Sequence, residues 1–140
     1  MTRTAAGTKM ISAIVVTHGR LGAEFVATAH KILGDFSGVY SLSNEDKTPH
    51  MLAEDIEAIM DHAGPDDAFI LLVDFLYGSC GHATLAVERN HRNVHVVSGV
   101  NLPMLLAFLN KRNETPFERL PSELAARGRE SIQSVDTDQL

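Results

Sequence analysis

The chain has 140 residues, the length of one domain, and a domain of this size buries roughly two-thirds of its unfolded surface without disulfides. Its 12 Lys and Arg residues against 18 Asp and Glu residues give a net charge of −6, which argues against a general nucleic-acid-binding surface and favours small molecules or proteins as partners. The single cysteine, Cys80, excludes an internal disulfide.

The sequence carries no targeting or membrane signal. Residues 1–10 are polar and lack the apolar core of a signal peptide. No apolar stretch reaches the roughly 20 residues that a membrane-spanning helix needs. We therefore expect a cytoplasmic protein in which residues 11–135 form a single domain, between polar tails at residues 1–10 and 136–140.

Short apolar runs that are typical of buried strands recur along the chain, at residues 11–16, around 36–42, at 68–73 and at 94–98. Each run is followed by apolar residues at the three- and four-residue spacing of a helix. Parallel strands that alternate with crossover helices form an open sheet with right-handed connections. The sequence therefore predicts a three-layer α/β/α sandwich with a four-stranded, mostly parallel sheet.

Capping residues mark the ends of the predicted helices. Gly34 suits the C-terminus of the first helix, because glycine readily adopts the conformation that ends a helix. Thr48 and Asn101 are typical N-caps, each with a proline in the turn that follows. The predicted helices cover residues 21–33, 49–63, 79–92 and 102–109, and a last one runs from Pro116 or Pro121 to about Gly128.

Thr17, His18 and Gly19 follow directly on the first apolar run, so a histidine lies where a strand ends and the chain turns towards a helix. In open α/β sheets, ligands bind at the carboxyl ends of the strands, where helix N-termini point N–H groups into the gap. A neutral imidazole there can act as nucleophile, base or ligand, and the neighbouring donors favour an anion such as phosphate. The simpler alternative is a histidine that only ends the strand.

Asp74 follows the run Ala68–Val73 and would emerge at the same edge of the sheet. If the two strands are neighbours, Asp74 can accept a hydrogen bond from one ring nitrogen of His18, which leaves the lone pair of the other nitrogen pointing outward. In the loop that follows, Gly78 and Gly81 allow close backbone approach, and Ser79 can cap the next helix. The N–H groups of that helix could hold phosphate oxygens.

Taken together, these residues resemble the mannose-family enzyme IIA of the bacterial sugar phosphotransferase system (PTS). The pair His-Gly alone is a weak signal, but its combination with Gly-Val-Asn-Leu-Pro-Met is specific, and the resemblance covers residues 11 to about 133. The matching segments, in the family's order and spacing, are Ile14-Val-Val-Thr-His-Gly19, Leu72-Val-Asp74, Gly78-Ser79 and Ser98-Gly-Val-Asn-Leu-Pro-Met-Leu105.

The resemblance implies a cytoplasmic phosphocarrier. Its histidine, here His18, takes phosphate on Nε2 from phosphorylated HPr and passes it to a IIB component, while Asp74 holds Nδ1. The phosphate would lie near Ser79 and the N–H groups of its loop, so the residues expected to bind it are Gly19, Gly78, Ser79 and Cys80. No metal or other cofactor is implied, and contact with a membrane is peripheral, at a permease, at most.

The resemblance also implies an assembly. In the family, the first and third strands are adjacent, and a short final strand is exchanged as an antiparallel strand between the subunits of a homodimer. The candidate for this strand is Ser131–Val135. The chain departs from the family at Tyr77, where glycine is common, and at Cys80, where proline often follows the serine. No linker to a IIB domain follows, so we expect a stand-alone IIA.

Two other functions use similar residues. A regulatory homologue would keep the phosphorylatable His18 but use its phosphorylation to signal, without a transport role. A histidine phosphatase also uses a strand-end His-Gly pair, although such enzymes normally carry an arginine where Thr17 lies, and Arg20 is the nearest arginine here. A serine hydrolase is disfavoured because Tyr77 replaces the first glycine of the G-x-S-x-G elbow.

The remaining histidines have simpler interpretations. We expect the three that fall on or beside helices to be solvated, and we expect His82 to be a plain first-turn residue that could make a secondary contact with the site. His91 and His95 have the spacing of a helical zinc pair, but a strand begins between them. The three solvated histidines are His30, His50 and His62.

Overall fold

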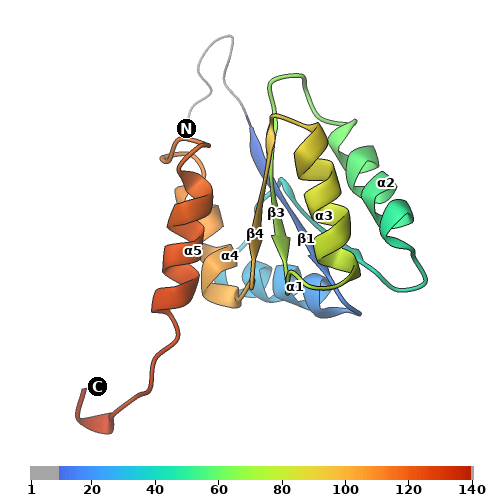
Figure 1. Cartoon of the computed structure of the whole chain (residues 1–140). Helices are drawn as coiled ribbons and strands as arrows, with labels where there is room; N and C mark the ends of the chain where they lie inside the picture. Colours follow the sequence, from blue (N-terminus) through green and yellow to red (C-terminus); the bar gives the residue numbers. More distant parts are fainter. Residues whose placement is uncertain (1–9, 140) are drawn as a thin grey trace.

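The computed structural model describes residues 10–139 (Figure 1), so the predicted N-terminal tail lies outside the described residues except for Met10, as does Leu140. Within these residues, four parallel strands form one sheet in the order β2-β1-β3-β4. Their bounds are β1 Ile11–Thr17, β2 Val39–Ser43, β3 Ala68–Val73 and β4 Val94–Ser98. The two inner strands, β1 and β3, are buried along their whole length, as their unbroken apolar runs predict.

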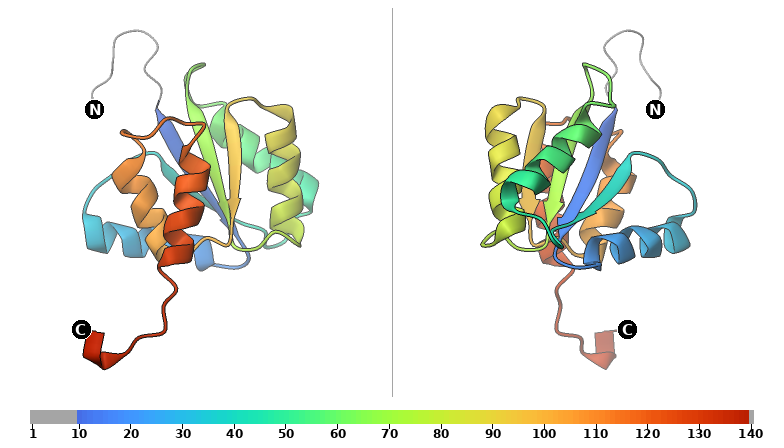
Figure 2. Two further views of the ribbon diagram at one scale, coloured as in Figure 1. Left: turned by 60° about the vertical axis from the view of Figure 1, so that its left-hand side comes forward. Right: turned by 90° about the vertical axis from the view of Figure 1, so that its right-hand side faces the viewer.

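In the described part of the chain, five α-helices cover the two faces of this sheet, which confirms the predicted three-layer fold (Figure 2). On one face, α2 and α3 pack over a cluster that includes Ile14, Leu71 and Val87. On the other face, α1, α4 and α5 enclose a cluster that includes Val15 and Phe108. The helices are α1 Leu21–Leu33, α2 Pro49–Met60, α3 Ser79–Asn90, α4 Leu102–Lys111 and α5 Leu120–Glu130.

Several predicted ends of elements are confirmed by their capping contacts. The Thr48 hydroxyl accepts a hydrogen bond from the Met51 N–H, and the Asn101 carboxamide accepts one from the Met104 N–H. The backbone N–H of Gly34, with φ of +84°, donates to the His30 carbonyl at the end of α1. Of the two starts proposed for the last helix, the later is correct, since α5 has its proline in the first turn.

Other boundaries differ from the prediction for local reasons. The second strand begins at Val39 rather than near Phe36, because Gly38 adopts a left-handed φ of +76° and the Phe36 ring stacks on the His30 ring. The third helix ends at Asn90 rather than Arg92, because His91 is already in an extended conformation.

The strand order places a switch point between β1 and β3. From β1 the chain moves outward to β2, and from β2 it returns past β1 to β3, so the loops that leave β1 and β3 diverge. Ligands of open α/β sheets bind in the crevice at such a point. The pairing of Val16 with Val73 brings the residues that follow, His18 and Asp74, to this crevice.

Beyond α5, the chain leaves the body of the domain (Figures 1 and 2). Residues 132–136 have no regular secondary structure, and the Ile132 and Val135 side chains are 77% and 65% exposed. The exchange of Ser131–Val135 with a second copy stays a prediction. Within residues 10–139, no helix combines the length and the apolar character that crossing a bilayer requires.

Candidate phosphoacceptor site

His18 is fixed at the carboxyl end of β1 by the turn that follows it. Gly19 adopts a left-handed φ of +56°, which reverses the chain into α1. The buried Thr17 hydroxyl accepts a 2.7 Å hydrogen bond from the Gly22 N–H in the first turn of α1. Strand and helix are thereby joined directly across His18, whose side chain remains 39% exposed.

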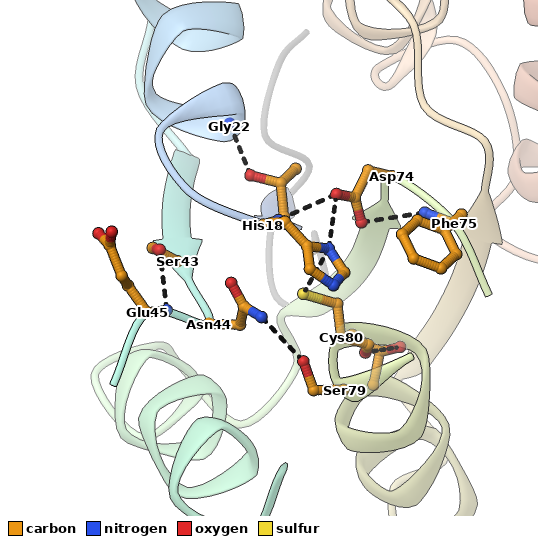
Figure 3. A network of polar contacts seen from close by, with 11 residues as sticks. His18, Gly22, Ser43, Asn44, Glu45, Asp74, Phe75, Ser79 and Cys80 are labelled. Carbon is orange, nitrogen blue, oxygen red and sulfur yellow. Dashed lines mark hydrogen bonds and ion pairs between the residues drawn. The ribbon is translucent and has the colours of Figure 1, made fainter. Parts of the chain in front are cut away.

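Asp74 contacts His18 through one carboxylate oxygen (Figure 3). Oδ2 lies 2.9 Å from Nδ1 of the His18 ring and accepts a second 2.9 Å hydrogen bond from the His18 backbone N–H. The other oxygen, Oδ1, accepts the Phe75 N–H at 2.9 Å. Because an ionised carboxylate only accepts, Nδ1 must carry the hydrogen, and the lone pair of the neutral ring therefore lies on Nε2.

The electrostatics of the pair favour an ionised Asp74. Burial alone raises the pKa of Asp74, but hydrogen bonds from the backbone and ring of His18 and from the Phe75 backbone outweigh it, so its pKa lies below the usual value. The Asp74 side chain is only 11% exposed. Its negative charge therefore lies against the ring and is partly shielded from solvent. Such a charge stabilises any positive charge that develops on His18.

Phe75 and Gly78 pack beside the His18 ring. The Phe75 ring stacks on it with centroids 4.9 Å apart and an angle of 13° between the planes. A Cβ atom added at Gly78 would lie 3.3 Å from the Phe75 ring and 3.6 Å from Cε1 of His18. Glycine at position 78 thus lets the start of α3 approach the ring carbon that separates the two ring nitrogens.

The prediction that Ser79 caps α3 is wrong. The N-cap is Gly78, and Ser79 is the first residue of the helix. Its hydroxyl oxygen instead accepts a 3.0 Å hydrogen bond from the Asn44 side chain, which reaches across from the end of β2 (Figure 3). Asn44 was not among the predicted site residues; the available signal was an asparagine two residues beyond the strand predicted around residues 36–42. As in any helix, the first N–H groups of α3 have no intrahelical acceptor.

A close approach within the loop requires Gly81. A Cβ atom at this position would lie 1.7 Å from the Leu76 carbonyl oxygen, which no side chain tolerates. The β3–α3 loop therefore folds tightly back onto the first turn of α3, and this holds Gly78 beside His18.

The Cys80 thiol lies on the Nδ1 side of the His18 ring rather than on the Nε2 side. This thiol is buried, with Sγ 3.7 Å from Nδ1 of His18. Burial raises the pKa of Cys80 to about 11, with a further contribution from the charge of Asp74. The thiol is therefore protonated at neutral pH and faces the nitrogen opposite Nε2, so any part that Cys80 plays in phosphate binding falls to its backbone N–H.

Within residues 10–139, the side chains of His18, Asp74 and Cys80 form the group that could hold a metal ion. One ligand atom each from His18, Asp74 and Cys80 lie within 4.8 Å of one another. A metal would have to displace both the thiol hydrogen and the hydrogen on Nδ1, and so break the contact between ring and carboxylate. The prediction that the site uses no metal stays a prediction.

The other predicted residues lie away from the site or at its margin. Gly19 borders it in the turn after His18, and His82 is exposed in the first turn of α3. Arg20 is exposed and pairs with Glu24 on α1. His91 pairs with Glu57, whereas the His95 ring stacks on Phe117.

The chain is similar in sequence to known proteins of one family. A sequence model of the family described as PTS system fructose IIA component (EIIA-man) matches residues 12–124. The mannose-specific EIIAB component of Escherichia coli strain K12 is 26% identical over 127 residues, which are 89% of this chain and 39% of that protein. The sorbose-specific EIIA component of Klebsiella pneumoniae is 24% identical over 119 residues, covering 84% of this chain and 86% of that protein. This chain thus spans well under half of the E. coli protein.

Solved structures share the fold. The PTS IIA protein associated with the fucose utilization operon of Streptococcus pneumoniae superposes with a TM-score of 0.79 at 19% identity, covering 94% of this chain and 98% of that one. The mannose/sorbose-specific IIA subunit of Enterococcus faecalis gives a TM-score of 0.75 at 22% identity, covering 91% and 96%. Since the family match runs from β1 into α5 and includes both His18 and Asp74, the chain belongs to the EIIA-man family of PTS IIA components.

Proposed function

We propose that the chain is a phosphocarrier of the sugar phosphotransferase system, which accepts phosphate on Nε2 of His18 from phosphorylated HPr and passes it to a IIB component. Family membership supports the class of reaction. The main support for His18 as the phosphate acceptor is the 2.9 Å contact between its Nδ1 and Asp74. This contact leaves the lone pair of Nε2 free on a partly exposed ring.

The proposed transfer needs few groups. The Nε2 lone pair attacks phosphorus, a nitrogen–phosphorus bond forms, and the bond between phosphorus and HPr breaks with its electron pair leaving on HPr. His18 keeps the hydrogen on Nδ1, so the phosphorylated ring is cationic, and the Asp74 carboxylate offsets that charge. Transfer to a IIB component is the same step in reverse, with a nucleophile of the IIB component taking the place of HPr.

Donors for the phosphate oxygens lie at the start of α3. The first N–H groups of this helix, from Ser79, Cys80 and Gly81, lack intrahelical acceptors, and the helix dipole adds partial positive charge there. Gly78 lets the start of α3 come close to the ring, and the position of a Cβ atom at Gly19 is open space. These residues are the proposed phosphate-binding set.

The rim of the site suits a protein partner. Tyr77 is 87% exposed in the β3–α3 loop, and Phe75 and Leu21 are about half exposed beside His18. Exposed aromatic side chains next to a reactive group are typical of protein–protein contact surfaces. HPr and a IIB component are the proposed partners at this rim, and the cytoplasm is the proposed location.

Phosphorylation in vitro tests the proposal. The purified chain is incubated with labelled phosphoenolpyruvate, enzyme I and HPr, and then with a IIB component. We expect label on the chain only when HPr is present, and release of the label when the IIB component is added. Absence of label with all components present contradicts the carrier function, and label that no IIB component accepts favours the signalling alternative.

A homodimer is the proposed assembly, with Ser131–Val135 as the exchanged strand. An exposed segment with two apolar side chains gains hydrogen bonds and burial by pairing with the open edge of a sheet. Ending the chain after Ser131 keeps α5 and the hydrogen bond from Asn101 to the Gly128 carbonyl, but removes most of the segment. We expect this truncation to convert a dimer to a monomer in light scattering at micromolar concentration.

Removal of residues 136–140 alone is the matched control for this truncation, and it should leave the dimer unchanged. Full-length protein that scatters as a monomer at the same concentration contradicts the exchange.

A further inference from the structure

Asn44 connects the end of β1, which carries His18, to the start of α3, which carries Ser79. It lies directly after β2, and its backbone N–H donates a 3.1 Å hydrogen bond to the carbonyl of Thr17, the residue before His18. Its side-chain Nδ2 donates a 3.0 Å hydrogen bond to the Ser79 hydroxyl oxygen at the start of α3 (Figure 3). One residue thus ties the strand that carries the imidazole to the helix that carries the proposed phosphate donors.

The backbone of Asn44 is held on both sides. Besides the bond to Thr17, its carbonyl accepts the Lys47 N–H at 3.1 Å, which closes the turn after β2. Asn44 is also partly buried, whereas the next residues, Glu45 and Asp46, are exposed. The backbone of Asn44 is therefore held in place, and the contact of its side chain with Ser79 does not depend on a freely moving loop.

The direction of this hydrogen bond determines what Ser79 can do. A hydroxyl has one hydrogen to donate and lone pairs that accept. Because the amide nitrogen of Asn44 has only hydrogens to offer, it occupies a lone pair of the Ser79 oxygen. The Ser79 hydrogen cannot then be donated to Asn44 and is left for another acceptor.

We infer that Asn44 is a positioning residue for phosphoryl transfer, which orients the Ser79 hydroxyl so that its hydrogen is donated to a phosphate oxygen on His18. The inference rests on the proposed function, since it requires phosphate at Nε2. Asn44 itself acts through Ser79, and its effect should be carried by that hydroxyl alone.

Substitutions at both positions test this inference, with the rate of His18 phosphorylation by phosphorylated HPr as the readout. Asn44→Ala should slow the transfer by about 3- to 30-fold, the range for losing one oriented hydrogen bond. Ser79→Ala should slow it by a similar factor, since backbone donors remain. In the double variant the loss should equal that of Ser79→Ala, because Asn44 has nothing left to orient.

Asn44→Asp tests the direction of the bond. A carboxylate is similar in shape but only accepts, so it would take the Ser79 hydrogen for itself and add negative charge near the phosphate. We expect this variant to be at least as slow as Asn44→Ala. If its rate matches that of the wild type, the amide oxygen of Asn44 faces Ser79 and the inference is wrong.

The control is Ser43→Ala, next to Asn44 in the chain. The Ser43 hydroxyl accepts a hydrogen bond from the Glu45 N–H, whereas the hydrogen bond to Ser79 comes from Asn44, so loss of the Ser43 hydroxyl should leave the rate unchanged. Thermal unfolding of each variant separates slow transfer from misfolding. Multiplicative losses in the Asn44→Ala/Ser79→Ala double variant contradict the inference. A wild-type chain that HPr does not phosphorylate contradicts the proposed function instead.

Discussion

Replacement of His18 by alanine should reduce phosphorylation by phosphorylated HPr to background. Among the described residues around His18, the two other candidate nucleophiles, Cys80 and Ser79, lack an available lone pair of comparable reactivity. The Cys80 thiol is buried with a pKa of about 11, and the Ser79 hydroxyl has no neighbouring base among the contacts described. The measurement is the label transferred from phosphoenolpyruvate through enzyme I and HPr.

His82→Ala is the matched control, since it removes an exposed histidine from the first turn of α3 and should leave the label unchanged. The label on the wild type should be lost in acid and stable in base, as expected of a phosphoramidate. Retention of wild-type label by the His18 variant would rule this residue out as the acceptor.

Asp74→Asn should slow the transfer by about 10- to 1,000-fold, on the scale of lost positioning and tautomer control. Both carboxylate oxygens of Asp74 accept N–H groups: Oδ2 accepts from His18 and Oδ1 from Phe75. An asparagine must place its amide nitrogen against one of these donors. If that nitrogen faces the ring, it favours the tautomer with the hydrogen on Nε2, and in either orientation the charge that stabilises the phosphorylated ring is gone.

Asp61→Asn serves as the control for charge, because Asp61 is exposed at the end of α2, away from the site. It should transfer phosphate at the wild-type rate. Circular dichroism should show the fold of the Asp74 variant retained, since the buried faces of β1 and β3 are unchanged. Wild-type kinetics in a folded Asp74→Asn protein would remove the proposed role of the carboxylate.

The secondary structure could be predicted from the sequence because its signals are local. The apolar runs of β1 and β3 and the capping residues Thr48 and Asn101 act over a few residues, and each element forms where its signal lies. Local preference also misled the prediction at one site residue. Serine is a favoured N-cap, but Gly78 takes that position, because the tight return of the loop at Gly81 brings Gly78 to the start of α3.

The candidate site, in contrast, depends on how distant segments pack. The sequence identified His18 and Asp74 as strand-end residues, but only the sheet order, with β1 beside β3, brings the carboxylate within 2.9 Å of Nδ1. The contact between Asn44 and Ser79 joins residues 35 positions apart. The position of the Cys80 thiol on the Nδ1 side of the His18 ring follows from the packing of α3. Residue patterns fix local conformation, whereas the neighbours of a strand are set by the burial of whole faces, which no short stretch of sequence encodes.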